Sequence, residues 1–165
     1  MTIQRITPAR AHALAGLLSS LAAERKFFFR TRPFDADDIE NDLTLMECQG
    51  IHDWGAFEDN GLLVGWATIR PERNQFEGFH HCGRLSMGVR KGYRGMGYGR
   101  RLLQAALDDT GFSRVELDVM GSNSNAIALY SSLGFVHEGR KVNARILDGV
   151  YDDIVLMART SPFTR

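Results

Sequence analysis

Few cysteines, few prolines and no long apolar run set the first limits on this chain. Its 165 residues include two cysteines and four prolines, and its acidic and basic residues balance to a formal net charge of zero. The two cysteines show no metal-ligand spacing and favour a reduced compartment, so we expect a cytoplasmic protein. No apolar run approaches the ~20 residues of a membrane span, and zero net charge gives no bulk attraction to nucleic acid or to a membrane.

The chain has an ordinary globular composition, with 44% hydrophobic and 24% charged residues. This length is sufficient for one domain with a substantial core. No linker, repeat or low-complexity stretch divides it, so we expect a single domain over residues 1–160 and a short tail over 161–165. Periodicity and turn residues predict strands at Ile3–Ile6, Gly55–Phe57, Leu62–Ile69, His81–Val89, Val115–Val119, Val136–Asn143 and Val150–Met157. Helices are expected at Pro8–Glu24, after Asp35, from the glycines near 97 to Thr110, and at Asn123–Leu133. The order of these elements predicts a mixed α/β sheet with helices on its faces.

The most informative segment is Arg90–Gly99, named the glycine loop. It holds four glycines between a strand pattern and an amphipathic helix pattern. Glycines let backbone N–H groups close on a ligand, and the N-terminus of the following helix favours an anion. The surrounding stretch, Gly78–Leu107, carries six of the 20 Lys and Arg residues and no Asp or Glu. These features together predict a phosphate site.

Two common phosphate motifs are excluded by single residues. A dinucleotide-binding fingerprint requires a third glycine where this chain has Leu102. A P-loop requires a lysine after Gly97, where this chain has Tyr98. The spacing that does fit is Arg-x-x-Gly-x-Gly, which begins at Arg94.

This spacing resembles the acyl-CoA pyrophosphate loop of the GNAT superfamily of N-acyltransferases. A second segment, Asn123–Phe135, matches that family's other signature, N-x-x-A-x-x-L-Y-x-x-x-G-F, at every fixed position. The resemblance extends in order from about Leu62 to Met157, and the tail is similar to the branch of ribosomal-protein N-terminal and amino-acid acetyltransferases. It implies an α/β fold in which about four helices flank a mixed, mostly antiparallel central sheet of about seven strands. It also implies a homodimer.

The resemblance implies a donor site for acetyl-CoA and no metal. Met87 and Val89 would pair their backbone with the pantetheine arm, and their N–H groups would polarise the acetyl carbonyl. Asn123 would form a hydrogen bond with the CoA arm. The pyrophosphate would be bound, mainly through backbone N–H groups, by Arg94, Gly95, Met96, Gly97, Tyr98, Gly99 and Arg100.

Tyr130 lies where the family often has a general acid for the leaving thiolate. Proton transfer from a phenol with a pKa of ~10 to a thiolate with a conjugate-acid pKa of ~8.5 is unfavourable by about 2 kcal/mol of free energy. We therefore expect Tyr130 to stabilise the developing negative charge on sulfur by a hydrogen bond, without full proton transfer. The amine must also lose a proton before it attacks. A water chain is one route, and the side-chain candidates for a base are Glu72, Glu77, His80, His81 and Asp118.

An acidic segment precedes these motifs. Between Asp35 and Asp53 there are seven Asp and Glu residues and no Lys or Arg. A solvated helix face is one interpretation, because acids near a helix N-terminus are stabilising. The other follows from the resemblance, in which this helix borders the acceptor cleft, where acids would concentrate a cationic amine.

We therefore expect an enzyme that transfers the acetyl group of acetyl-CoA to a primary amine by direct attack in a ternary complex. The amine would belong to a small molecule, an amino acid or a peptide N-terminus. The alternative is a non-catalytic acyl-CoA-binding module, against which an intact Tyr130 argues. A nucleic-acid-binding or nucleotide-binding domain is disfavoured by the zero net charge and by the missing motifs.

Overall fold

The computed structural model describes residues 1–73 and 75–161 and resolves into two compact units. Unit 1 comprises Met1–Ile69 and Ser86–Thr110, and unit 2 comprises Arg70–Leu85 and the chain from Gly111 onward. Two strands, β3 and β4, run from one unit into the other. The expected single domain over 1–160 stays a prediction, and residues 162–165 of the expected tail lie outside the described residues.

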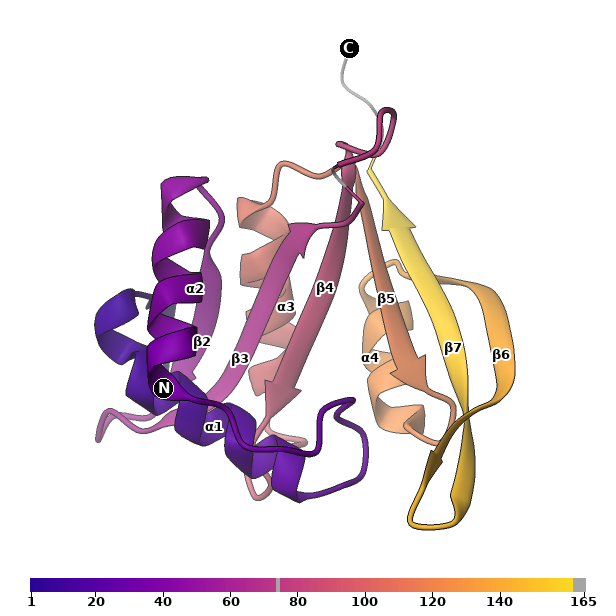
Figure 1. The fold of residues 1–165 in the computed structure, drawn as a ribbon, viewed down its shortest axis with the longest axis horizontal. Coiled ribbons are helices and arrows are strands. Elements are labelled where there is room, and N and C mark those ends of the chain that lie inside the picture. Colours follow the sequence, from indigo (N-terminus) through magenta and orange to yellow (C-terminus); the bar gives the residue numbers. More distant parts are fainter. Residues whose placement is uncertain (74, 162–165) are drawn as a thin grey trace. The chain divides into compact units, whose positions relative to one another are not determined.

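Unit 1 contains a strand ladder with helices on both faces. Strand β1 pairs antiparallel with β2, and β2 pairs antiparallel with β3. Helices α1 and α2 lie on the near side of β2 and β3 in Figure 1, whereas α3 lies behind them. The elements of this part are β1 (Thr2–Ile6), η1 (Pro8–Arg10), α1 (Ala11–Ala23), α2 (Ala36–Cys48), β2 (Asp53–Phe57), β3 (Leu63–Pro71), β4 (Cys82–Val89) and α3 (Tyr98–Asp109).

The first residues of α2 and α1 show which sequence signals determined where each helix begins. Asp35 caps α2, which begins directly after it as expected, because its side chain accepts hydrogen bonds from the N–H groups of Asp37 and Asp38 at 2.9 and 3.2 Å. Thr7 does not cap with its side chain, and Pro8 begins a short 3-10 turn before α1. Pro8 is thus the first residue of the 3-10 turn, and α1 begins at Ala11, three residues later than predicted.

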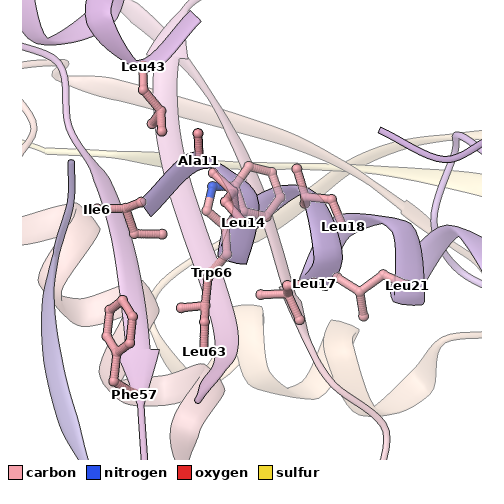
Figure 2. Close-up of a cluster of buried hydrophobic side chains, with 10 residues drawn as sticks. All are labelled: Ile6, Ala11, Leu14, Leu17, Leu18, Leu21, Leu43, Phe57, Leu63 and Trp66. Carbon is pink, nitrogen blue, oxygen red and sulfur yellow. The ribbon is translucent and has the colours of Figure 1, made fainter. Parts of the chain in front are cut away.

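A cluster of aliphatic side chains from α1 forms the core of unit 1 (Figure 2). Leu14 and Leu17 are fully buried, and Leu43 from α2 joins them. Trp66 from β3 completes the cluster, and Phe28 from the segment after α1 packs edge-on to it at 6.5 Å. The leucines of α1 recur at helical spacing, so they form one continuous apolar face that packs against β2 and β3.

Two polar residues, Asp53 and Thr68, are buried beside this core. Asp53, at the start of β2, is 2% exposed. Its two carboxylate oxygens accept hydrogen bonds from the indole N–H of Trp66 at 2.6 Å and from the hydroxyl of Thr68 at 2.7 Å. These bonds join β2 to β3 inside the unit, and a buried carboxylate requires such partners.

Replacing Thr68 with valine should destabilise the fold by about 2 kcal/mol, since the new methyl group cannot donate to the buried carboxylate of Asp53. Thermal or urea unfolding measures the change. The same substitution at the exposed strand residue Thr2 is the control, for which we expect a change of about 0.5 kcal/mol or less. Equal effects at the two positions would show that the Thr68 hydroxyl contributes nothing specific.

Unit 2 is built on a second antiparallel ladder. Strand β5 pairs with β7, and β7 pairs with β6. The parallel ladder between β4 and β5 covers Cys82–Arg84 and Arg114–Glu116. Asp148 and Gly149 join β6 to β7 with φ angles of +51° and +79°, the left-handed pair of a tight hairpin. The elements are β5 (Arg114–Met120), α4 (Ser124–Ser132), β6 (Val136–Leu147) and β7 (Val150–Thr160).

The hydrogen-bonded strand order is β1-β2-β3-β4-β5-β7-β6. This seven-stranded mixed sheet and its four α-helices confirm the predicted fold class, including the order of elements along the chain. In the described part of the chain, no helix combines the length and the apolar character needed to cross a membrane.

Candidate active site

The glycine loop takes its shape from left-handed backbone conformations. Gly92, Gly95 and Gly97 have φ angles of +93°, +76° and +84°. A Cβ built on any of the three would meet no atom within 4 Å, so conformation and not space requires glycine at these positions. The chain can therefore turn between β4 and α3 through backbone conformations that residues with a Cβ rarely adopt.

Helix α3 presents its N-terminus at the end of this loop. Gly97 is the N-cap and supplies no capping side chain, and the first turn contains no acidic residue. The first N–H groups of a helix have no acceptor within the helix, and the helix dipole makes this end positive. The loop and the helix start thus form a cluster of backbone donors suited to an anion.

Tyr98 anchors the end of the loop by its side chain. It is buried, its ring packs edge-on to that of Tyr93 at 6.0 Å, and its hydroxyl donates a hydrogen bond to Glu58 in the turn after β2. This bond raises the pKa of Tyr98 to about 12. The sequence predicted a backbone role for Tyr98, whereas its inward side chain and its partner Glu58 appear only in the structure.

Arg94 anchors the middle of the loop. Its guanidinium donates to the carbonyl of Val89 at 2.8 Å and to both carboxylate oxygens of Glu24, at 2.8 and 2.6 Å. The side chain of Arg94 is thus bound to the protein through three nitrogens, and the backbone role of the loop toward phosphate stays a prediction. No sequence motif pointed to Glu24, which follows α1 some seventy residues earlier.

Arg90 carries an orphaned donor at the start of the loop. Its Nε is buried and has no hydrogen-bond partner among the described residues. Buried polar groups are rarely left in this state. An anion at the loop would supply an acceptor of the right charge, so the residues present fit a phosphate-bearing ligand.

The other predicted donor residue and the acid lie in unit 2. Asn123 caps α4, because its side-chain oxygen accepts from the N–H of Ala126 at 3.3 Å. This cap uses the oxygen and leaves the amide NH₂ as a donor. Tyr130 lies on α4 with 9% of its surface exposed and with its ring 5.9 Å from that of Phe135. Burial raises the pKa of Tyr130 to about 12.

The five candidate bases differ in whether they are hydrogen-bonded to Arg84 and in how far they are exposed. Arg84 donates to Glu72 at 2.9 Å and to Asp118 at 3.1 Å, so the two carboxylates share one guanidinium. Burial opposes the charge of Arg84, but these hydrogen bonds outweigh it and raise the pKa of Arg84. His81 is half-buried, with Nε2 3.5 Å from the sulfur of the next residue, and His80 is exposed, as is Glu77.

The remaining predicted residues fall within single units. Met87 and Val89 end β4 in unit 1, beyond the residues that pair with β5.

A cavity of about 70 Å³ in unit 1 is lined by β1, α2 and β2 and includes no residue of the glycine loop. Among residues 1–73 and 75–161, no group of three or more His, Cys, Asp or Glu side chains is arranged to hold a metal ion.

Comparison with known proteins agrees with this geometry. Residues 17–135 match the model of the acetyltransferase (GNAT) family. The L-amino acid N-acyltransferase MnaT of Escherichia coli (strain K12) is 29% identical over 136 residues, which cover 76% of this chain and 78% of that protein.

Two solved structures share the fold over nearly the whole length. The ribosomal-protein-alanine N-acetyltransferase from Brucella melitensis has a TM-score of 0.88 at 25% identity, covering 98% of this chain and all of that one. The structure of yncA from Salmonella typhimurium with its cofactor acetyl-CoA has a TM-score of 0.89 at 22% identity, covering 100% and 99% of the two chains. The match to the family model spans both signature segments, and the chain belongs to the GNAT acetyltransferase family.

Proposed function

We propose that the protein transfers the acetyl group of acetyl-CoA to the primary amine of an amino acid or of a peptide N-terminus. The observation that carries this proposal is the glycine loop, whose left-handed glycines and uncapped helix start form a donor-rich anion site. Membership of an acetyltransferase family supports the pyrophosphate of acetyl-CoA as the ligand of this site. Similarity to MnaT and to the Brucella enzyme supports an amino acid or a peptide as acceptor.

The donor is held by backbone groups more than by side chains. The N–H groups of residues 95–99 would bind the pyrophosphate, each charge-assisted hydrogen bond contributing roughly 1.5–3 kcal/mol. Arg90 and Arg100 would add positive charge at either end of the loop. Met87 and Val89 would pair with the pantetheine arm, and the amide NH₂ of Asn123 would donate to it.

Transfer requires no covalent intermediate on the protein. The neutral amine nitrogen attacks the acetyl carbonyl carbon and the carbon–sulfur bond breaks. The nitrogen loses a proton as the amide forms, and the sulfur leaves as a thiolate that takes up a proton from water. Tyr130 stabilises this thiolate by a hydrogen bond. Since its pKa is raised to about 12, giving its proton to a thiolate of pKa ~8.5 would be uphill by about 5 kcal/mol, so Tyr130 keeps its proton.

The amine proton would leave through one of the side-chain candidates or through a water chain. All five side-chain candidates belong to unit 2, together with Tyr130. Glu72 and Asp118 accept hydrogen bonds from Arg84, whereas His80 and Glu77 are exposed and His81 is half-buried. The pH dependence of kcat/KM in variants of His80 and His81 distinguishes a histidine base from a water chain.

Substituting Asp37, Asp38 and Asp42 together with asparagine should raise the KM of a cationic acceptor about fivefold and leave the KM of acetyl-CoA unchanged. Asp37 and Asp38 are exposed on α2 and carry charge that attracts a cation. The effect should shrink as salt is added, because exposed charges are screened. A neutral acceptor is the control, and an equal change for both acceptors would reject the attraction.

The exposed apolar side chains of β6 and β7 support a homodimer. Val142, Ile146 and Val150 are among them, at 72%, 58% and 69% exposure, and β6 is an edge strand of the sheet. Light scattering of the protein and of its Val142→Lys variant tests this, since a monomer in both samples would contradict it. The free cysteines, Cys48 and Cys82, suit the reducing cytoplasm in which we expect the protein to act.

One assay tests the proposed function. The protein is mixed with acetyl-CoA and a panel of amino acids, basic peptides, polyamines and aminoglycosides, and the free thiol is followed with time. Thiol release that depends on one acceptor supports the transferase. Thermal stabilisation by acetyl-CoA, about 1 kcal/mol or more at several times a micromolar Kd, with no release for any amine would favour a non-catalytic binding module.

A further inference from the structure

The side chain of Arg94 makes a connection that the signature of the glycine loop does not account for. Its Nε donates to the carbonyl of Val89, the last residue of β4, at 2.8 Å. Its two terminal nitrogens donate to the two carboxylate oxygens of Glu24, at 2.8 and 2.6 Å. All three residues belong to unit 1, so the geometry of this contact is internal to one compact unit.

Glu24 is an unexpected neighbour for an anion site. A carboxylate near a bound pyrophosphate repels it, so electrostatics alone would favour a neutral residue at this position. The contact also adds little to overall stability, because 20% of the Glu24 side chain and 43% of the Arg94 side chain are exposed. The presence of a bidentate carboxylate–guanidinium pair therefore calls for a reason other than charge or fold stability.

Geometry supplies that reason. A bidentate pair fixes the plane of the guanidinium as well as its position. With Glu24 in place, the third nitrogen of Arg94 is directed at the Val89 carbonyl, where β4 ends and the glycine loop begins. The following residue, Gly95, has a left-handed φ of +76° and offers no stiffness of its own. The loop is thus anchored at the residue that precedes its phosphate-binding N–H groups.

We propose that Glu24 is a positioning residue for the donor site: it holds Arg94 across the start of the glycine loop and so keeps the loop's N–H groups directed at the pyrophosphate of CoA. This inference rests on the proposed function, since it takes a CoA-type pyrophosphate as the ligand. It makes the C-terminal end of α1, where Glu24 is the capping residue, part of the donor site, although no signature residue lies on that helix.

The test is the affinity for CoA measured by calorimetry, which does not depend on turnover. Glu24→Gln should raise the Kd of CoA about tenfold, and Glu24→Asp should do nearly the same because its carboxylate is one methylene too short to reach Arg94 in the same geometry. In the kinetic assay, the KM of acetyl-CoA should rise by the same factor while the KM of the amine stays within about twofold.

Unit 2 offers a matched control. Arg114 donates to both carboxylate oxygens of Glu138, at 3.0 and 2.5 Å, and forms the same type of pair between residues that are not part of the glycine loop. Glu138→Gln should leave the Kd of CoA unchanged. In an Arg94→Met background, Glu24→Gln should have no further effect, because Glu24 acts through Arg94.

The opposite outcomes are distinct. Equal or tighter CoA binding by Glu24→Gln would overturn the inference alone and leave the proposed function standing, as would a full effect of Glu24→Gln in the Arg94→Met background. Absence of CoA binding by the unmodified protein would overturn the proposed function, and this inference with it.

Discussion

Replacing Tyr130 with phenylalanine should lower kcat about 100-fold and leave the KM of acetyl-CoA within about threefold. The substitution removes only the hydroxyl, and the buried ring can keep its contact with Phe135. Removing a single donor that stabilises a developing negative charge typically costs about 10²–10³ in kcat. Steady-state kinetics with saturating acceptor measures the change.

The pH dependence separates stabilisation of the thiolate from proton transfer. Burial raises the pKa of Tyr130 to about 12, so the phenol keeps its proton over the whole range of a practical assay. The variant should then have the pH profile of the unmodified enzyme at a lower rate. A profile that loses one limb in the variant would show instead that Tyr130 titrates during turnover.

Tyr151→Phe is the matched control for Tyr130. Tyr151 lies on β7 in the same unit and is 62% exposed, so loss of its hydroxyl should leave kcat unchanged. A rate for Tyr130→Phe that equals the rate of this control would assign the transferase chemistry to groups other than Tyr130.

Replacing Gly97 with alanine should raise the KM of acetyl-CoA about 100-fold. At a φ of +84° an L-residue is strained by roughly 1–2 kcal/mol, and the loop can relieve this strain by turning its peptide groups. Misdirecting two charge-assisted hydrogen bonds removes about 3 kcal/mol or more of binding, which corresponds to the stated factor. Initial rates at varied acetyl-CoA measure it.

Gly149→Ala is a control that separates the effect of backbone strain on folding stability from the effect of the glycine loop on acetyl-CoA binding. Gly149 has a φ of +79° in the β6–β7 turn, and a Cβ at either glycine would meet no atom within 4 Å. Both variants should therefore lose similar folding stability in thermal unfolding, whereas only Gly97→Ala should lose affinity for acetyl-CoA. A similar KM in the two variants would mean that the glycine loop does not bind the donor.

The order of secondary structure was predictable because it depends on local pattern. Alternating Val115, Leu117 and Val119 proved to be the buried face of β5, and Asp35 and Asn123 capped the helices that follow them. Boundaries were less accurate. Strand β6 extends to Leu147, four residues beyond the predicted end at Asn143, because its pairing with β7 resumes after an irregularity at Lys141–Arg145. That pairing depends on the partner strand and not on the pattern of β6 itself.

The backbone shape of the glycine loop follows from its residue types, whereas the hydrogen-bond partners of its side chains depend on residues far along the chain. The glycines at 92, 95 and 97 adopt the left-handed conformations that only glycine adopts easily, so the residue type already specified the backbone there. The side chain of Tyr98 could not be placed from its neighbours, because its partner Glu58 lies forty positions earlier.

By itself, the sequence determined the class of this protein, because two signature segments with fixed spacing place it among the GNAT acetyltransferases. It also predicts that the glycine loop binds the acyl donor. This was possible because backbone shape and helix polarity follow from local residue types. Tertiary structure alone decided how the loop is held, by Glu24 through Arg94 and by Glu58 through Tyr98, and which candidate bases are already engaged by Arg84. Such partnerships form between residues far apart in the chain, and only the packing of α1, the β2–β3 turn and the strands brings them within hydrogen-bonding distance.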